Sequence, residues 1–520
     1  MKFDKIVIVG GGSAGWMTAA TFIHQFPNKE IVLMESPNIP TVGVGESTIG
    51  GINEWLTLLQ INDKDFMPHC DASYKLSIRF ENFYKNGDGG FHYPFGNPYV
   101  KNNKFGTNDW YFKKACMPEL HTSNYADCYY PQMALVNQNK LYKNKDGLLP
   151  YFNFNKDTAV HFDATKFGLW LKEHYCLPRG VKHILEDVVD IDVDENGIKT
   201  INNKYTADLF IDCTGFKSLL LDKTLKEPFE SYTDILPNNS AWATRIPYTD
   251  KEKELVGYTN CTALGNGWVW NIPLWSRIGT GYVYSDKYVS DEEALKEFKK
   301  HLGRDDLEFK NLKMRVGIHN RIFVKNVCAI GLSAGFIEPL ESNGLYTVHD
   351  FLMKLMKVLK RDETNISQFD KDTFNLTAKA RFRTFAEFVA LHYALSHRDD
   401  TEYWKDVRKR NYGDNNIDYV KFITGFTNVK IDRIINKQYN LDDGITCIAT
   451  GMNCFPVIWN DIISTEYEPK YNEEKTKKNI LNTISHLDKQ KQEWNEKVSL
   501  EKSLYQYLKE NIHNENSTIE

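Results

Sequence analysis

Residues 5–23, KIVIVGGGSAGWMTAATFI, contain the pattern that decides the fold. The β-branched run that opens this stretch is typical of a buried parallel strand. Gly10, Gly12 and Gly15 follow in the register G-x-G-x-x-G, and the residues after them favour a helix. Glycines in this register allow a tight turn, the close approach of a pyrophosphate and the packing of helix on strand. The stretch predicts a dinucleotide site, with a plain βαβ packing turn as the alternative.

Residues 13–36 give further support for the dinucleotide site. Ser13 and Ala14, between the last two glycines, begin the expected helix, whose free N–H groups would bind the phosphates. A second strand, residues 30–36, carries Glu35 near its end. Glu35 lies about 20 residues after the last glycine, where an acid that binds ribose hydroxyls is expected.

Two later segments indicate which dinucleotide binds. In residues 206–218 a strand ends at Asp212 and is followed by Gly215, and residues 327–339 repeat the order of strand, glycine and helix start. This layout resembles FAD proteins of the two-dinucleotide-fold monooxygenase type. We therefore expect an α/β, Rossmann-like FAD-binding module with a mostly helical substrate-binding module. The sequence contains no second G-x-G-x-x-G motif for a nicotinamide cofactor.

The two modules are expected to be interleaved along the chain. Residues 1–85 and 155–350 would form the discontinuous FAD-binding module, and residues 86–154 and 351–520 the substrate-binding module. From about residue 466 the chain is highly charged, with apolar positions at helical spacing. We expect a C-terminal pair of helices on the outside there. Charged helices of this kind can also mediate self-association, so a homo-oligomer is an alternative to a monomer.

Composition limits the classes of partner. The 520 residues include 64 basic and 69 acidic side chains, a net charge of −5 that gives no reason to expect nucleic acid as a partner. Nine scattered cysteines without a CxxC pair indicate reduced thiols and no metal site. No apolar run reaches the roughly 20 residues that a membrane helix needs, and the N-terminus has no signal-peptide pattern. We expect a cytoplasmic protein that has no membrane partner.

Four stretches together resemble the flavin-dependent halogenases, in particular the tryptophan-halogenase family. They are GGGSAGWMTAA (10–20), VGVGEST (42–48), WVWNIP (268–273) and GFIEPLESNG (335–344). The glycine stretch is shared with many flavoproteins. The W-x-W-x-I-P and E-P-L-E-S motifs are much narrower, so the resemblance depends chiefly on them.

The resemblance implies a reaction and its reagents. In the family, reduced FAD reacts with O2 to give a flavin hydroperoxide, a halide attacks it to form hypohalous acid, and a buried lysine passes the halogen to an aromatic carbon. The chain would thus use FADH2 from a separate NAD(P)H-dependent flavin reductase, a chloride, bromide or iodide ion, and a small electron-rich arene of the indole or phenol type. The alternatives are a flavin-dependent aromatic hydroxylase and a flavin-binding regulatory protein without turnover.

Two residues are expected to be catalytic. Lys75, in SYKLSIRFENF (73–83), matches the family lysine, since a desolvated amine suits a halogen carrier. Arg79 competes for this role, but its guanidinium does not deprotonate. By the resemblance, Glu341 is the carboxylate that would stabilise the cationic arene intermediate and help to remove its proton. Glu338 is its competitor, because either acid could cap the first turn of a helix.

Further contacts follow from the resemblance. The backbone N–H groups of Asn343 and Gly344 would bind the halide, a suitable role for a nest of amides. The family more often has Thr or Ser at the position of Asn343, which leaves the order of halide preference open. Additional FAD contacts are expected from Ser47 on the strap of the second motif, Val188 near the adenine, Leu332 and Leu345.

The substrate side is expected to be aromatic. Tyr93 and Phe95 lie in a stretch similar to the family loop that packs the indole, and Ser342 adjoins the catalytic carboxylate. Phe455 and Trp459 are the candidates from the C-terminal third. A counterpart of the acid and paired tyrosines that hold free tryptophan is not found, so an indole, phenol or other activated arene is the expected substrate.

Trp268 and Trp270 have two readings. They are two residues apart on an expected strand and therefore share one face. Paired tryptophans of this kind are usually core residues. In the family they separate the flavin from the arene, which directs the oxidant to the halide.

Overall fold

The computed structural model describes residues 1–39, 46–101, 103, 106–143, 147–410, 443–454 and 473–514. Phe455 and Trp459, two of the residues expected on the substrate side, lie outside the described residues.

The predicted N-terminal strands lie in a six-stranded sheet. Its order is β19 (Phe323–Val324), β20 (Val327–Ala329), β11 (Leu209–Asp212), β1 (Lys5–Val9), β2 (Glu30–Glu35) and β8 (Lys182–Leu185). All neighbours pair in parallel except β19 with β20. The inner strands β20, β11, β1 and β2 are almost fully buried because helices cover the sheet, as in α/β folds, whereas the edge strand β8 is partly exposed. This confirms the expected Rossmann-like module.

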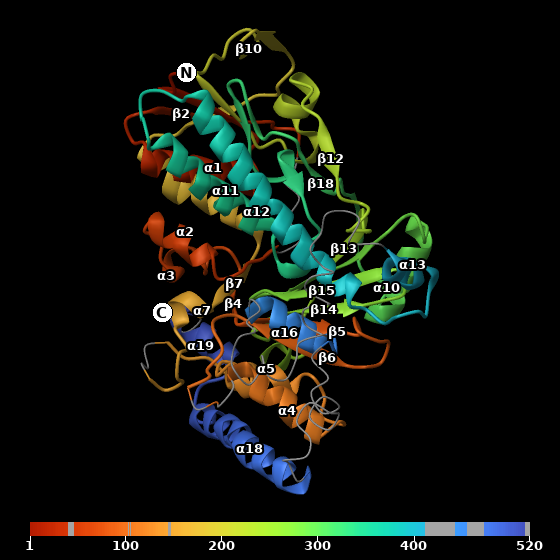
Figure 1. Ribbon diagram of the computed structural model, residues 1–520. Helices are drawn as coiled ribbons and strands as arrows, with labels where there is room; N and C mark the ends of the chain where they lie inside the picture. Colours follow the sequence, from red (N-terminus) through yellow and green to blue (C-terminus); the bar gives the residue numbers. More distant parts are fainter. Residues whose placement is uncertain are drawn as a thin grey trace.

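Helices pack on this sheet in the upper half of Figure 1. Helix α1 (Ser13–Gln25) contacts α8 (Ala164–Trp170) and α11 (Gly344–Leu359), and α11 in turn packs along α12 (Gln368–Ala394). Since α11 is one continuous helix, the module boundary expected at residue 350 falls inside it.

A second, seven-stranded sheet crosses the middle of the molecule (Figure 1). Its order is β17 (Lys310–Lys313), β13 (Ser240–Ile246), β16 (Ile278–Tyr284), β15 (Gly267–Pro273), β14 (Tyr258–Ala263), β5 (Ser77–Glu81) and β6 (Gly90–Pro94). The pairing is antiparallel except between β14 and β5. Side chains alternate between its faces. Trp268 and Trp270 face the main core, and Val269 packs in a separate cluster with Phe298 of α10 (Asp291–Leu302).

A small sheet of β3 (Glu46–Ser47), β7 (Ala159–Phe162) and β4 (Ser73–Lys75) adjoins the seven-stranded sheet. Strand β7 lies in the centre and pairs antiparallel with both neighbours. Only Leu76 separates β4 from β5, so the chain passes from one sheet to the other within a single residue. This transition places Lys75 where the two sheets meet.

The lower part of Figure 1 is helical. It contains α4 (Asp109–Cys116), α5 (Asn124–Tyr129), α18 (Glu473–Val498) and α19 (Leu504–Asn511). Helix α6 (Met133–Asn137) contacts α5, and α16 (Asp443–Gly451) packs against β6. Helix α18 packs on α4, α5 and α6 through buried residues that include Ile484 and Leu487. The expected C-terminal helix pair is confirmed. None of the helices in the described ranges combines the length and apolar character needed to cross a bilayer.

Shorter elements complete the structure. They are α2 (Ile52–Leu58), α3 (Asp63–Phe66), α7 (Phe154–Asp157), α9 (Lys251–Glu254), α13 (Glu402–Lys409), the hairpin of β9 (Ile191–Asp194) and β10 (Gly197–Ile201), and a three-stranded sheet of β12 (Phe229–Ser231), β18 (Gly317–His319) and β21 (Gly335–Phe336).

The glycine loop gives a test of stability. Gly10 has a φ of 117°, and an added Cβ would lie 2.2 Å from the Cys213 carbonyl oxygen, whereas a Cβ on Gly12 would meet nothing within 4 Å. We expect Gly10→Ala to lower the free energy of unfolding of the cofactor-free protein by about 2–3 kcal/mol. Gly12→Ala should change it by less than about 1 kcal/mol. Urea unfolding measures both, and equal losses would contradict this account of the loop.

Candidate active site

A buried lysine forms the centre of the site. The Lys75 ammonium donates hydrogen bonds to Ser47 Oγ at 2.7 Å, to the Thr48 carbonyl oxygen at 3.0 Å and to Ser342 Oγ at 2.7 Å. The side chain has no solvent exposure. Lys75 lies on β4, Ser47 ends β3 and Thr48 follows it directly. Ser342 follows the short helix Pro339–Glu341 in a left-handed conformation with φ of 58°. All three ammonium protons are thus satisfied.

The surroundings of Lys75 change its protonation. Burial lowers the pKa of Lys75 to about 7, against the opposing effects of Cys261 and Glu341. The Phe95 ring lies over Nζ, with its centroid 5.1 Å away. A substantial fraction of this amine is neutral near pH 7, which suits a nucleophile or a halogen carrier.

The two competing acids have different surroundings. Glu341 is 1% exposed, and its Oε1 lies 3.0 Å from Nε2 of the buried His392 on α12. Burial raises the pKa of Glu341, and the neighbouring His392 and Lys75 oppose this shift. Glu341 is therefore the acid whose charge couples to Lys75.

Glu338 belongs to a separate network. Its Oε2 accepts hydrogen bonds from Trp268 Nε1 at 2.9 Å, Asn238 Nδ2 at 2.7 Å and the Tyr393 hydroxyl at 2.7 Å. Burial raises the pKa of Glu338, and these three donors oppose the shift. Three donors on one oxygen make Glu338 an anchor for its neighbours, an environment that differs from that of Glu341 beside His392.

Arg79 does not contact Lys75 or the residues that hold it. Its guanidinium donates to Glu81 Oε2 at 2.9 Å and to Asn260 Oδ1 at 3.1 Å. These residues alternate with the core-facing Phe80 and Cys261 along β5 and β14. Arg79 therefore lies on the opposite face of the sheet from Lys75 and is no longer its competitor.

The residues expected to bind halide begin α11. Asn343 is the N-cap of this 16-residue helix, and Gly344 is its first residue. The first N–H groups of a helix have no intrahelical partner and carry partial positive charge, which favours an anion. A Cβ on Gly344 would lie 3.2 Å from Glu46 Oε2, and burial raises the pKa of Glu46 to about 7. A protonated Glu46 would remove one negative charge from this end of the helix.

The glycine loop fits the dinucleotide. Gly12 is the N-cap of α1 and borders open space, and Ser13 Oγ donates to the Ala164 carbonyl oxygen at 2.8 Å. A Cβ on Gly11 would overlap Glu35 Oε2, so this carboxylate lies directly over the loop. The other oxygen, Glu35 Oε1, accepts from His183 Nε2 at 2.8 Å and contacts Lys172 Nζ at 3.2 Å. The loop thus offers free amides for phosphate and an oriented acid for ribose.

Two of the residues expected to contact FAD are occupied by other partners. The Asp212 carboxylate accepts hydrogen bonds from both N–H and hydroxyl of Thr214 and from the N–H groups of Leu220 and Leu221. It therefore shapes the turn that contains Gly215, whose φ is 68°. The Ser47 hydroxyl is likewise occupied, by hydrogen bonds from Lys75 and Ser342. Only the backbone of Ser47 is then left for a contact with the cofactor.

The other residues expected to contact FAD lie at positions compatible with a cofactor bound at the glycine loop. Ala14 lies beside the Gly331 turn, because a Cβ on Gly331 would come within 2.9 Å of it. Leu332, in the same turn, is 41% exposed, and Leu345 is buried in the first turn of α11. Val188 is half-buried three residues beyond β8, at the edge of the sheet where Glu35 also ends its strand.

Phe95, whose ring lies over Lys75, packs with further aromatic side chains. Phe95 is 8% exposed, and its ring centroid lies 6.4 Å from that of Tyr93, which packs against Phe388. Trp268 and Trp270 are both buried, with ring centroids 6.2 Å apart. Ser342, expected to touch the substrate, instead directs its hydroxyl at Lys75 and Ser47.

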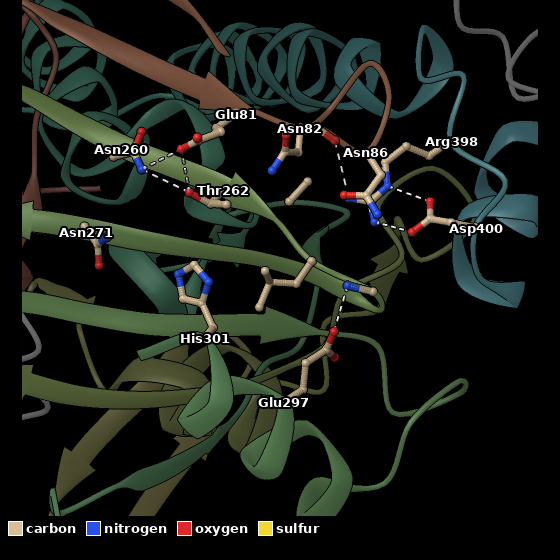
Figure 2. Close-up of a pocket in the computed structure, with 13 residues that line it drawn as sticks. Glu81, Asn82, Asn86, Asn260, Thr262, Asn271, Glu297, His301, Arg398 and Asp400 are labelled. Carbon is tan, nitrogen blue, oxygen red and sulfur yellow. Dashed lines mark hydrogen bonds and ion pairs between the residues drawn. The ribbon is translucent and has the colours of Figure 1, made fainter. Parts of the chain in front are cut away.

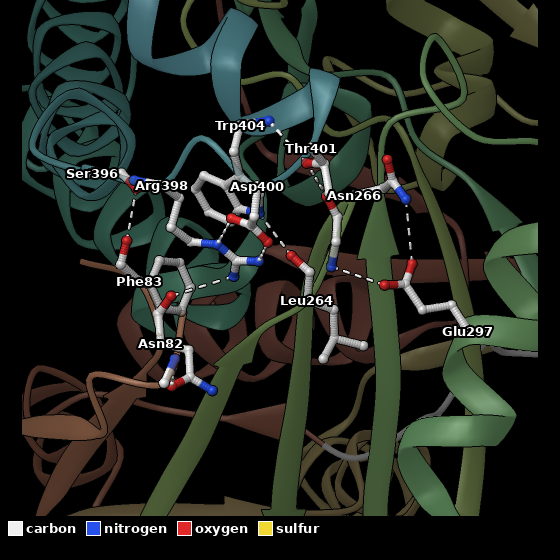
Figure 3. Close-up of polar contacts among 12 residues, drawn as sticks. Asn82, Phe83, Leu264, Asn266, Glu297, Ser396, Arg398, Asp400, Thr401 and Trp404 are labelled. Carbon is white, nitrogen blue, oxygen red and sulfur yellow. Dashed lines mark hydrogen bonds and ion pairs between the residues drawn. The ribbon is translucent and has the colours of Figure 1, made fainter. Parts of the chain in front are cut away.

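A polar cavity of about 580 Å³ lies on the other face of the seven-stranded sheet (Figure 2). Its carboxylates and its arginine already have partners within the protein. Arg398 forms two hydrogen bonds with Asp400, at 2.9 and 2.7 Å, and Glu297 accepts from the Gly265 N–H at 2.8 Å (Figure 3). A further hydrogen bond, from Trp404 Nε1 to the Leu264 carbonyl oxygen, holds the 396–404 segment to the end of β14. This cavity is a structural junction that is separate from the lysine.

Sequence patterns did not reveal several residues of the site. His392 reaches Glu341 from a helix some fifty residues later, and Thr259 and His161 extend the hydrogen bonds from Ser47. Alternation within their strands predicts burial for Thr259 and His161. It does not predict partners that are 98 or more residues apart.

Comparisons with known proteins agree with this geometry. Residues 5–465 match the family model described as tryptophan halogenase. The chain is 35% identical over 433 residues to the 7-chloro-L-tryptophan 6-halogenase KtzR of Kutzneria sp. (strain 744), which covers 78% of this chain and 82% of that protein. It is 33% identical over 436 residues to the tryptophan 7-halogenase RebH of Lentzea aerocolonigenes, which covers 79% of this chain and 80% of RebH.

A solved structure is similar over nearly the whole chain. The apo structure of VirX1 matches with a TM-score of 0.89 and 38% sequence identity, covering 98% of this chain and 100% of VirX1.

The buried ammonium predicts a pH dependence of stability. The pKa of Lys75 falls from 10.5 in the unfolded chain to about 7 in the folded one, so between these values the unfolded state binds more protons. The free energy of unfolding should therefore rise with pH from about 7 to 10. In Lys75→Met that slope should be shallower by up to about 1.4 kcal/mol per pH unit.

Urea unfolding at several pH values measures the slope. Lys199→Met is the matched control, because the Lys199 side chain is 61% exposed. An unchanged slope in Lys75→Met would mean that Lys75 stays protonated in the folded protein.

Proposed function

Since the chain belongs to the tryptophan halogenase family, we propose that it is a flavin-dependent halogenase that attaches halogen to an electron-rich aromatic ring. One observation carries the proposal: a fully buried lysine lies beside an aromatic ring and a buried carboxylate, with a pKa lowered to about 7. A flavin hydroxylase has no use for such an amine, so this alternative is not favoured.

The glycine loop would hold FAD by its pyrophosphate, with Glu35 on the ribose. Reduced FAD, when bound, supplies the oxygen chemistry that turns a halide ion into an electrophile. The chain's own contribution is to exclude water, to bind the halide at the start of α11 and to present Lys75 and Glu341 to the arene. The reduced flavin would come from a separate NAD(P)H-dependent reductase.

Lys75 would receive the electrophilic halogen and direct it to one ring carbon. Its three oxygen partners fix Nζ in position, and Phe95 fills the space over it. Glu341 would accept the proton that the ring loses, since its raised pKa makes it a better base than an exposed carboxylate. His392 would orient the Glu341 carboxylate through its 3.0 Å contact.

The substrate would be an indole-bearing or related arene. The names of the relatives KtzR and RebH specify tryptophan rings, and Tyr93, Phe95 and Phe388 offer aromatic surfaces for a flat ring. A homo-oligomer through the charged C-terminal helices is a further part of the proposal.

Turnover with mass spectrometry tests the reaction. The protein, FAD, a flavin reductase and NADH are supplied with a panel of indoles, phenols and anilines, and with chloride, bromide or iodide in separate reactions. We expect a product with a halide-shifted mass that Lys75→Ala lacks and Lys199→Ala retains. An oxygen-shifted product, or halogenation that survives in Lys75→Ala, would contradict the lysine mechanism.

Glu341→Gln tests the role of the acid. The amide has nearly the same shape but is not basic, so kcat should fall by about 10²–10⁴-fold while arene binding changes little. Glu338→Gln is the matched comparison, and we expect its main effect to be lost stability. A larger loss of kcat in Glu338→Gln than in Glu341→Gln would reverse the assignment.

A further inference from the structure

We propose that His161 is a positioning residue that takes a proton from Lys75 through the hydroxyl groups of Ser47 and Thr259, and so produces the neutral amine inside the closed site. This inference rests on the proposed function, because it explains how a solvent-free lysine prepares for halogen transfer.

The path is a continuous chain of hydrogen bonds. Lys75 Nζ lies 2.7 Å from Ser47 Oγ, Ser47 Oγ lies 2.7 Å from Thr259 Oγ1, and Thr259 Oγ1 lies 2.9 Å from His161 Nε2. All four residues are at least 95% buried. They come from four different strands, β4, β3, β14 and β7. Proton transfer along hydrogen bonds of this length needs only small movements of the heavy atoms.

The groups at the two ends of this hydrogen-bond path, Lys75 and His161, fix the direction of every hydrogen bond in it. The lysine ammonium only donates, and Ser47 Oγ also accepts from Ser342 Oγ at 3.0 Å. The single Ser47 proton must therefore point to Thr259, and the Thr259 proton to His161 Nε2. At the far end, Ser73 Oγ lies 3.4 Å from His161 Nδ1 and donates to the Pro273 carbonyl oxygen at 2.6 Å.

This arrangement selects one tautomer of His161. Ser73 uses its only proton on Pro273, so both groups beside His161, Ser73 Oγ and the Pro273 carbonyl oxygen, act as acceptors for Nδ1–H. Nε2 is then left with a free lone pair that faces Thr259. The imidazole therefore presents a proton acceptor to the chain that begins at Lys75.

The step is balanced and involves protons only. The Lys75 Nζ–H bond breaks as an O–H bond forms on Ser47, the Ser47 proton passes to Thr259, and the Thr259 proton passes to His161 Nε2. Lys75 becomes a neutral amine and His161 an imidazolium, with both hydroxyl groups restored. The reverse transfer resets the site after the halogen has left.

The groups around the hydrogen-bond path from Lys75 to His161 determine where the transferred proton resides. Burial and then the charge of Lys75 lower the pKa of His161 well below its ordinary value. Cys261 and Glu341 are the titratable groups that face Lys75 from β14 and from the Pro339–Glu341 turn. Burial disfavours a charged His161 even without Lys75, and a hydrogen bond with the Pro273 backbone opposes this effect. The proton therefore rests on Lys75, and His161 holds it only during the transfer.

Thr259→Val tests the path, because it removes the linking hydroxyl at nearly constant volume and keeps both ends. Thr262→Val is the matched control on the same strand, with its side chain on the opposite face beside the outer cavity. The rate of halogen transfer is measured in single turnovers from pH 6 to pH 9. We expect Thr259→Val to be at least tenfold slower at pH 6 and to approach the wild-type rate at pH 9, where Lys75 deprotonates unaided.

Either of two results would overturn the proposal: a wild-type rate in Thr259→Val at pH 6, or an equal loss at every pH, which marks a purely structural role. If Thr259→Val fails to fold, His161→Gln gives the same comparison, because glutamine accepts the Thr259 hydrogen bond but is not basic.

A measurement without turnover separates this inference from the proposed function. Nitrogen NMR of histidine-labelled, cofactor-free protein reports the tautomer, with the His161 signal assigned by its loss in His161→Gln. We expect a protonated Nδ1, a bare Nε2, and a higher pKa of His161 in Lys75→Met. A protonated Nε2 would overturn the path. A wild-type protein that shows the expected tautomer but no halogenated product would overturn the proposed function alone.

Discussion

The burial of one ammonium group is the constraint on which this structure depends. An isolated charge in a protein interior is costly unless oxygen atoms replace its lost water. For Lys75 these oxygens come from β3 and from the turn after Pro339–Glu341, segments almost 300 residues apart in the chain. The small sheet and the start of α11 must therefore converge at one point. A fold that satisfies the ammonium also brings Glu341 and the start of α11 close to it.

Two buried carboxylates three residues apart show how context assigns roles. Glu338 is held by three donors from three separate segments and ties Trp268 to α12. Glu341 has one close partner, the imidazole of His392, and a direct electrostatic link to Lys75. Chemically identical side chains thus occupy different environments because of the number of hydrogen bonds each receives.

Much of the fold and part of the site could be predicted from sequence. The glycine register, the two terminal acids and the β-branched strands are local patterns, and local patterns predicted β1, α1, β2, β11 and β20 correctly. Lys75 and Glu341 were found by resemblance to a family. The partners of these residues could not be predicted, because His392, Thr259 and His161 reach the site through long-range contacts that no local spacing encodes. The same limit applies to Ser342, whose hydroxyl binds Ser47. Asp212 differs, because its donors Thr214, Leu220 and Leu221 follow it closely in the chain.

The single residue between β4 and β5 sets a limit on how this region can change. Leu76 donates its N–H to the Gly257 carbonyl oxygen at 2.7 Å and accepts from the Phe95 N–H at 3.0 Å, so it is tied on both sides while the chain changes sheets. Because side chains alternate along a strand, inserting or deleting one residue here would turn the lysine away from its oxygens. Homologous chains can vary in side chains around this point, but their length across it should be invariant. An alignment gap at this position would mark a protein that has given up the chemistry while keeping the scaffold.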